Sequence, residues 1–258
     1  MGLPFDENSS FMRGPADAPP VIKAEVFSAA HNLWSEAGLD LTDRFHDVGS
    51  VSVGEGEDMF TSVESAVAAL LEKNYRPILL GGDHAVTVPI IRAFAREYSK
   101  LSVLHFDAHP DLYDDFEGNR YSHACPFSRI LEEGLIQRLV QVGIRAFTEP
   151  QREQAARFNL EVMEMKDWDD ERVFKFDGPV YISFDVDGLD PACAPGVSHR
   201  EPGGFTTRQA LRVIQSLGGQ LVGADIVEYN PHRDFQNMTA VVCAKLCKEL
   251  AARMLMDH

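Results

Sequence analysis

The sequence lacks a hydrophobic run long enough to cross a membrane, because no window approaches the roughly 18 unbroken apolar residues that a spanning helix needs. Its first ten residues, MGLPFDENSS, lack the basic and apolar regions of a secretory signal. They also miss the N-myristoylation pattern, since Asp6 stands where serine or threonine is required. These absences argue against a membrane protein, and we expect a cytoplasmic one.

Cysteine is also scarce. The four cysteines in 258 residues (Cys125, Cys193, Cys243 and Cys247) do not form the framework of a disulfide-stabilised secreted domain. Cys243 and Cys247 are four residues apart, on one face of an expected helix, with no histidine or second cysteine pair nearby. We therefore expect both to be buried as small apolar side chains.

Clusters of positive charge are missing as well, and the formal net charge is −16. This balance argues against nucleic acids and anionic membranes as partners, and it is compatible with a cationic substrate. The chain has no internal repeat, low-complexity tract or Pro/Ser-rich linker, and 45% of its residues are hydrophobic. We expect one globular domain over residues 1–258.

Apolar residues recur at helical spacing in four segments: 61–74, 85–98, 206–217 and 238–255. Short runs rich in Val, Ile and Leu lie between them, at 76–82, 101–107, 138–145, 179–187 and 221–230. Near-continuous apolar runs that alternate with helices are typical of buried parallel strands. The pattern predicts an α/β fold around a mainly parallel sheet.

Acidic and imidazole side chains follow four of these strands. They are His84 in GGDH, Asp107, His109 and Asp111 in HFDAHPD, Asp185 and Asp187 in SFDVDGLDP, and Glu228 in VEYNP. In open parallel sheets, ligands bind outside the carboxyl ends of the strands. We therefore expect these side chains to meet at one edge of the sheet.

The spacing of the acids indicates a metal site. Asp107, His109 and Asp111 alternate along the chain, and Asp185 and Asp187 repeat that spacing, so extended backbone presents each set on one side. An oxygen-rich set with some nitrogen suits Mn²⁺, and four carboxylates balance the charge of two divalent ions. DAHPD alone is equally compatible with a solvated turn, and DVDGLDP alone favours a turn. Their convergence with GGDH favours metal binding.

GGDH, HFDAHPD, SFDVDGLDP and VEYNP, in this order, resemble the ureohydrolase family of arginases and agmatinases, and the resemblance covers nearly the whole chain. The segments FEGNRYSHA and APGVSH are similar to the plant-arginase and agmatinase-like branch. The resemblance implies a three-layer α/β/α sandwich and a homotrimer or homohexamer. It also implies two Mn²⁺ ions per chain, with Ni²⁺ or Co²⁺ as alternatives.

The resemblance further implies how the ligands divide. His84 and Asp111 would hold one ion, His109 and Asp187 the other, and Asp107 and Asp185 would bridge both. Two metals about 3.5–4 Å apart can activate one shared water for attack on a guanidinium carbon, which yields urea and an amine. In this scheme Asp107 also orients the attacking hydroxide.

Two further residues receive catalytic roles from the resemblance. Glu228 would anchor the guanidinium, because a carboxylate can accept paired N–H bonds from it. His123, in RYSHACPF, would move a proton, since imidazole titrates near neutral pH. We expect the other histidines to be structural (His31, His46, His105, His199 and His232), with His199 in a loop near the site. Arg145 is expected to form a structural ion pair.

The substrate is read from the loop 111–122. Asp114, Asp115 and Glu117 would favour the ammonium tail of agmatine, whereas Asn119 and Arg120 would favour a carboxylate. We expect agmatine, hydrolysed to putrescine, with Asn119 beside the tail. Arginine, another guanidino acid or a formimino substrate is the alternative. A two-metal phosphoesterase is disfavoured because its usual Asn-His motif is absent, and a non-catalytic homologue is disfavoured because all the motif residues are present.

Overall fold

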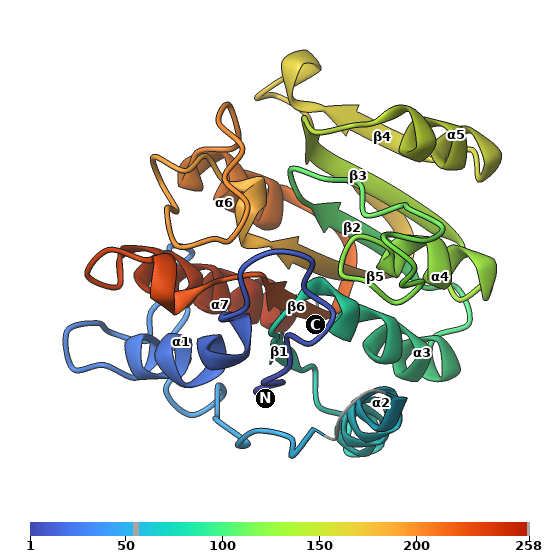
Figure 1. Cartoon of the computed structure of the whole chain (residues 1–258). Coiled ribbons are helices and arrows are strands. Elements are labelled where there is room, and N and C mark those ends of the chain that lie inside the picture. Colours follow the sequence, from blue (N-terminus) through green and yellow to red (C-terminus); the bar gives the residue numbers. More distant parts are fainter. Residues whose placement is uncertain (54–56, 257–258) are drawn as a thin grey trace.

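The structure is a computed structural model that describes residues 1–53 and 57–256. Six parallel strands form one sheet in the order β1–β6–β5–β2–β3–β4 (Figure 1). The strands are β1 (Ile78–Leu80), β2 (Ser102–Phe106), β3 (Arg138–Ile144), β4 (Glu161–Glu164), β5 (Lys175–Asp185) and β6 (Gly218–Val227). The α-helices are α1 (Ala18–Val26), α2 (Glu57–Leu71), α3 (Thr87–Glu97), α4 (Pro126–Glu132), α5 (Glu149–Arg157), α6 (Thr207–Ser216) and α7 (Met238–Met256).

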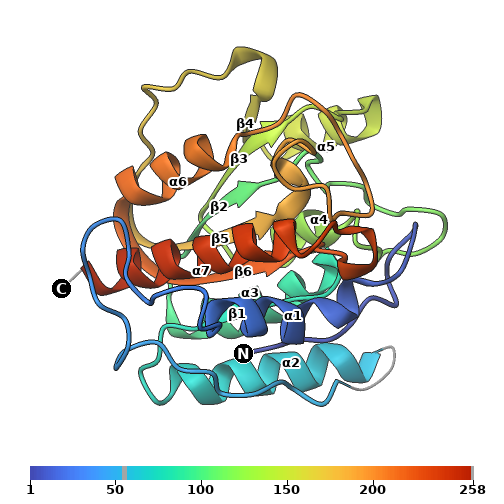
Figure 2. The same ribbon diagram turned by 90° about the vertical axis from the view of Figure 1, so that its left-hand side faces the viewer.

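Helices cover both faces of the sheet. α1, α6 and α7 lie on the face that is turned to the viewer in Figure 2, and α2, α3 and α4 lie on the other. The strands supply both cores by alternation: Val180, Ile182 and Phe184 of β5 face the first group, and Tyr181 faces the second. The predicted three-layer α/β/α sandwich is confirmed, and its organisation as a single domain stays a prediction.

The four helices expected from periodicity appear as α2, α3, α6 and α7, and each of the five apolar runs overlaps a strand. Cys243 and Cys247 are buried on α7, as expected. Near the start of the chain, Gly2 forms single bridges with Leu80 and Ser50, so the first residues run alongside β1. In the part of the chain that the structure describes, no helix is long and apolar enough to span a membrane.

Strand register brings the predicted site residues to one level. Phe106 of β2 pairs with Phe184 of β5, and Asp185 pairs with Val227 of β6. Asp107 and Glu228 are the next residues after Phe106 and Val227, so both leave the sheet beside Asp185. The chemistry-bearing turns after β1, β2, β5 and β6 therefore share the carboxyl edge of the sheet.

Candidate functional site

His84 lies in the turn after β1, and three carboxylates surround its ring. Its Nδ1 is 3.0 Å from Asp111 Oδ2, 3.2 Å from Asp185 Oδ2 and 3.3 Å from Asp107 Oδ2. Its other nitrogen, Nε2, lies 3.0 Å from the Ser183 hydroxyl. Nδ1 is fully buried and has no hydrogen-bond partner. A buried imidazole nitrogen that faces three carboxylate oxygens, without a hydrogen bond, is the arrangement that a cation would complete.

A second cluster forms around His109. Its Nδ1 lies 3.1 Å from Asp187 Oδ2 and 3.4 Å from Asp107 Oδ1. Asp107 thus presents one oxygen to each histidine, as a bridging carboxylate would. Asp185 presents Oδ2 to His84, while its Oδ1 accepts the N–H of Asp187 at 2.7 Å. The predicted role of Asp185 as a bridge between both ions stays a prediction.

The electrostatics of these clusters fit two divalent ions. Burial, together with the charges of Asp187 and Asp107, raises the pKa of Asp185 well above its usual range. Burial also raises the pKa of Asp187. Burial and mutual repulsion therefore disfavour the ionised forms of Asp185 and Asp187, whereas bound cations would favour them. The donor set, oxygen with two imidazoles and no thiolate, suits hard or borderline metals.

Glu228 and His123 form a buried pair beside the clusters. His123 Nδ1 lies 2.9 Å from Glu228 Oε1, which also accepts the N–H of His84 at 2.9 Å. Burial disfavours a charged His123, but the carboxylate of Glu228 outweighs burial and raises the pKa of His123 to about 9. Among the described residues, Oε2 of Glu228 accepts no hydrogen bond. Glu228 also has a left-handed backbone, with φ 63°, of the kind that concentrates at functional sites.

A cavity of about 200 Å³ opens over the clusters. Six predicted site residues line it: His109, Asp111, Asp185, Asp187, His123 and Glu228. The other lining residues were not predicted as site residues: Ser10, Tyr113, Phe116, Ala124, Gln151 and His199. Most of them come from loops and carry no charge, so spacing along the chain gave no signal for them.

His199 is one of the residues that the sequence left as structural. Its ring lies 5.8 Å from that of His109, 5.4 Å from that of His123 and 5.3 Å from that of Phe11, measured between centroids. Burial lowers the pKa of His199, so its imidazole is neutral near pH 7. The only signal in the sequence was its place in the loop APGVSHREPGG, which belongs to the family resemblance.

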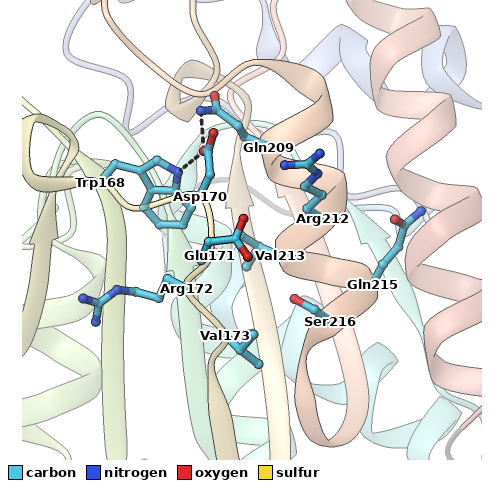
Figure 3. Close-up of a pocket in the computed structure, with 10 residues that line it drawn as sticks. All are labelled: Trp168, Asp170, Glu171, Arg172, Val173, Gln209, Arg212, Val213, Gln215 and Ser216. Atoms are coloured by element: carbon cyan, nitrogen blue, oxygen red, sulfur yellow. Dashed lines mark hydrogen bonds between the residues drawn. The ribbon is translucent and has the colours of Figure 1, made fainter.

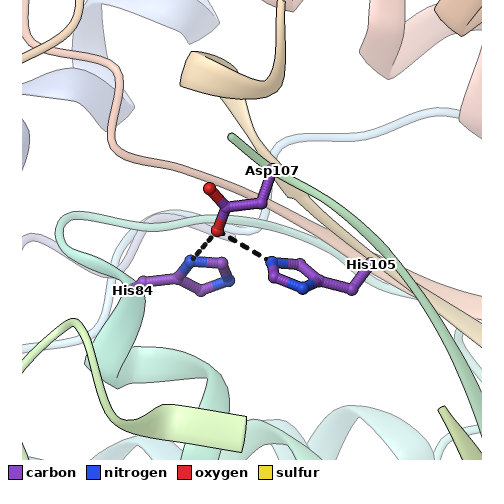
Figure 4. Close-up of side chains that lie close together, drawn as sticks. All are labelled: His84, His105 and Asp107. Atoms are coloured by element: carbon purple, nitrogen blue, oxygen red, sulfur yellow. Dashed lines mark hydrogen bonds and ion pairs between the residues drawn. The ribbon is translucent and has the colours of Figure 1, made fainter. Parts of the chain in front are cut away.

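His105, expected to be structural, is buried in β2 and also contacts a candidate metal ligand. Its Nε2 lies 2.9 Å from Asp107 Oδ2, on the oxygen that also faces His84 (Figure 4). The amide Nε2 of Gln141 donates to His105 Nδ1 at 3.0 Å, so the ring proton sits on the nitrogen that faces Asp107. His105 therefore holds the orientation of a candidate metal ligand.

Arg145 does not form the ion pair that we expected, as no carboxylate lies within 4.0 Å of its guanidinium among the described residues. It donates instead to the carbonyl oxygens of Gly143, Asp187, Gly188, Leu189 and Glu201. The guanidinium thereby ties the end of β3 to the loop that carries the candidate ligand Asp187. Its role is structural, but its partners are backbone groups.

Asp114 and Asp115, in the acidic loop after β2, have partners away from the cavity. Asp114 pairs with Arg129 and Arg120, and Asp115 accepts the N–H of Gly118. Neither of these acids lines the cavity, and neither does Glu117. The expectation that they attract an ammonium tail is therefore wrong.

Asn119 does not line the cavity either. Its amide donates to Asn8 Oδ1, and its oxygen accepts the N–H of Tyr121. Its predicted contact with substrate has no support in this geometry. Cys125 is buried with Sγ 3.7 Å from the Asn119 carbonyl, and burial raises the pKa of its thiol to about 12, so it is not a reactive thiolate.

Comparison with known proteins agrees with this geometry. Residues 1–252 match the sequence family described as "Arginase family". The chain belongs to the arginase family. It is 45% identical to "Arginase 1, mitochondrial" of Arabidopsis thaliana, over 98% of this chain and 80% of that protein. The solved "Arginase from Medicago truncatula" superposes with a TM-score of 0.92 and 42% identity, covering 98% of this chain and 86% of that one.

A more distant member of the arginase family has another printed activity. "Guanidinobutyrase" of Pseudomonas aeruginosa is 33% identical over 97% of this chain and 84% of its own length. The chain is thus a hydrolase of guanidino C–N bonds. Agmatine, the substrate that we expected, has no support among these relatives, and the arginase alternative fits better. The expected cytoplasmic location has no support either, since the Arabidopsis relative is named mitochondrial.

Proposed function

We propose that this protein hydrolyses the guanidino group of arginine, which yields urea and ornithine. The observation that carries the proposal is the match to plant arginases over almost the whole chain. Four candidate ligands and Glu228 line one cavity, which supports it. The guanidinobutyrase relative supports a second candidate substrate, a guanidino acid without an α-amine.

We assign the metal ligands as two sets that share Asp107. The first is His84, Asp111 and Asp185, and the second is His109 and Asp187. Two Mn²⁺ ions bound there would lower the pKa of a water and make it nucleophilic near neutral pH. The buried Nδ1 of His84, which has no hydrogen-bond partner, supports this assignment. The homo-oligomer expected from the sequence stays a prediction.

Glu228 and His123 take the two remaining roles, which are guanidinium binding and proton transfer. Oε1 of Glu228 is held by His84 and His123, so its Oε2 can accept an N–H of the substrate guanidinium. His123 carries the proton that the departing amine needs, since its pKa lies near 9. Its Nε2 lies 2.8 Å from the Ser10 hydroxyl at the cavity wall, and that nitrogen is the atom from which the proton would leave.

The test is urea release from a panel of arginine, 4-guanidinobutyrate and agmatine after loading with Mn²⁺, and then with Ni²⁺. We expect urea from arginine and a loss of turnover and bound metal in Asp187→Ala. A panel with no urea above blank for any substrate would rule out the ureohydrolase proposal. Full activity of Asp187→Ala would rule out the two-metal assignment.

A further inference from the structure

Helices α5 and α6 begin with the same local motif. The N–H and the hydroxyl of Thr148 both donate to Oε1 of Gln151, at 3.2 and 3.0 Å. In α6, the N–H and the hydroxyl of Thr206 donate to Oε1 of Gln209, both at 2.9 Å. A backbone N–H can only donate, so the amide atom that faces it must be oxygen. In both helices the amide nitrogen Nε2 is therefore turned the other way.

The two amide nitrogens have different surroundings. Nε2 of Gln209 donates to the carboxylate of Asp170 at 2.8 Å, as Figure 3 shows. Gln151 lines the active-site cavity with only 2% of its surface exposed, and its Nε2 donates to no residue that the structure describes. The chain itself thus shows what this motif binds when a carboxylate is within reach. At Gln151, the cavity is where such a carboxylate would lie.

The amide of Gln151 is held in place before any substrate arrives. Since the Thr148 hydroxyl donates to Oε1, it must accept from the Tyr113 hydroxyl, which lies 2.8 Å away. Tyr113, Thr148 and Gln151 form a one-way chain of hydrogen bonds that fixes the direction of both amide N–H groups. A donor held in this way loses little freedom when a ligand binds.

The topology separates Gln151 from the guanidinium end. Glu228 follows β6, the metal ligands after β5 and β2 occupy the middle, and Gln151 lies in the helix that follows β3, the next strand in the sheet. A substrate whose guanidinium contacts Glu228 would thus extend its tail towards Gln151. Among the lining residues, every acid is either a candidate metal ligand or Glu228, so no spare carboxylate is present for an ammonium tail.

We propose that Gln151 is a specificity-determining residue that donates hydrogen bonds to a carboxylate at the tail of the substrate. This inference rests on the proposed ureohydrolase function and narrows its substrates to guanidino carboxylic acids, arginine among them, over guanidino amines. The competing explanation is that Gln151 only caps α5. A capping role affects stability alone, whereas a binding role changes the preference between tails.

Gln151→Glu separates the two roles. Glutamate can accept the same two bonds from Thr148, so the helix cap is kept while the N–H donors become an anion. With metal-loaded protein, we expect the ratio of kcat/KM for 4-guanidinobutyrate to that for agmatine to fall by about 10- to 100-fold, since a hydrogen bond to a charged group is replaced by repulsion. An unchanged ratio would overturn the proposal.

Gln209 supplies the matched control. Gln151→Ala and Gln209→Ala should lower Tm to a similar extent, because each removes the same cap. Only Gln151→Ala should reduce the preference for 4-guanidinobutyrate over agmatine. Equal changes in preference from both variants would show that the effect is one of stability and would refute a role in binding.

A binding measurement keeps this inference separate from the proposed function. Calorimetry with 4-aminobutanoate and putrescine, which share an amine end and differ in the tail, needs no turnover. We expect Gln151→Glu to weaken the binding of 4-aminobutanoate and to tighten the binding of putrescine. If the wild type releases no urea but binding shifts in this way, the ureohydrolase proposal fails and the tail site stands. If urea is released and the binding of the two amines does not shift, the ureohydrolase proposal stands and the tail site at Gln151 fails.

Discussion

A row of buried polar side chains lies beneath the candidate metal ligands. Gln141, His105, Ser183 and Asp225 occupy neighbouring positions on β3, β2, β5 and β6, in register. His105 bonds to one candidate metal ligand, Asp107. Ser183 bonds to the other nitrogen of His84 and donates to Asp225 at 2.8 Å. Partners of this kind orient metal ligands and tune their affinity. The row explains why polar residues interrupt otherwise apolar strands.

Ser183→Ala tests the link between this row and the metal. The change leaves His84 Nε2 without its partner and removes one of three hydroxyl donors to Asp225. We expect the metal affinity to fall by about 10- to 100-fold, measured by competition with a chelator. Ser102→Ala, another buried serine on β2 at the opposite end of the sheet, is the control and should leave affinity unchanged. Equal affinity in wild type and Ser183→Ala would refute the link.

Glu228→Gln should weaken the binding of a guanidinium while metal content stays near normal, because Glu228 contacts the backbone N–H of His84 and not its ring. Loss of metal would instead show that its role is misassigned. The variant should also lower the pKa of His123, since the carboxylate charge is what outweighs burial.

The His123–Glu228 pair has a defined pH signature. The folded-state pKa of His123 is raised from 6.5 to about 9, so the stability that it contributes is complete below pH 6.5 and is lost as the pH rises through 9. The difference in unfolding free energy between wild type and Glu228→Gln, measured with urea on metal-free protein, should therefore shrink from pH 6 to pH 9.5. A difference that grows over this range would contradict the pairing.

At the scale of elements, the sequence predicted what hydrophobic periodicity can report. α3 and α7 bury broad apolar faces, and the strands are near-continuous apolar runs, so both were found. α5 buries only Gln151 and Ala155, and β4 has no fully buried residue, so neither produced a periodic signal. The candidate ligands could be found because all of them stand at or within five residues after the end of an apolar strand. Gln151 was not, since its function depends on contacts that only the fold creates.

The N-terminal segment shows another feature that spacing does not reveal. It crosses the turn after β1 so closely that a Cβ on Gly82 would lie 1.6 Å from the carbonyl oxygen of Phe5. The same oxygen accepts the N–H of Asp83 at 2.8 Å, and the segment continues to Ser10 at the cavity. Gly82 therefore couples the packing of the chain's first residues to the turn that carries His84.

Gly82→Ala should be among the most damaging single changes outside the ligands. The added methyl group meets fixed backbone, so we expect the unfolding free energy to fall by more than about 4 kcal/mol, or soluble protein to be lost. Gly38→Ala is the control, because its φ of 78° makes alanine strained but nothing lies within 4 Å of the new Cβ. That change should cost about 1–2 kcal/mol in urea denaturation. Similar losses of unfolding free energy in the two variants would show that the Phe5 backbone does not pack against Gly82.

At the scale of the whole molecule, the fold and the candidate metal centre depend on each other. The candidate centre joins the turns after β1, β2 and β5. In the sheet β2 and β5 are neighbours, and β6 separates β1 from β5. The candidate centre carries four carboxylates in a chain of net charge −16. Without cations these carboxylates repel, and the protein compensates by proton uptake. Burial disfavours a charged His84, but the nearby carboxylates of Asp107, Asp111 and Asp185 outweigh burial and raise its pKa well above the usual range.

Metal should therefore stabilise the protein more as the pH rises. The raised pKa values of His84, His109 and Asp185 mean that metal-free protein holds protons near neutral pH, and these must leave when ions bind. Those protons also stabilise the metal-free fold, and that stability is lost as the pH rises through the raised pKa values. We expect the gain in Tm on adding Mn²⁺ to chelator-treated protein to increase from about pH 6.5 to about pH 8.5. Asp187→Ala should show a much smaller gain at both pH values. A gain that is equal at the two pH values, or larger at the lower one, would mean that these side chains do not exchange protons for metal.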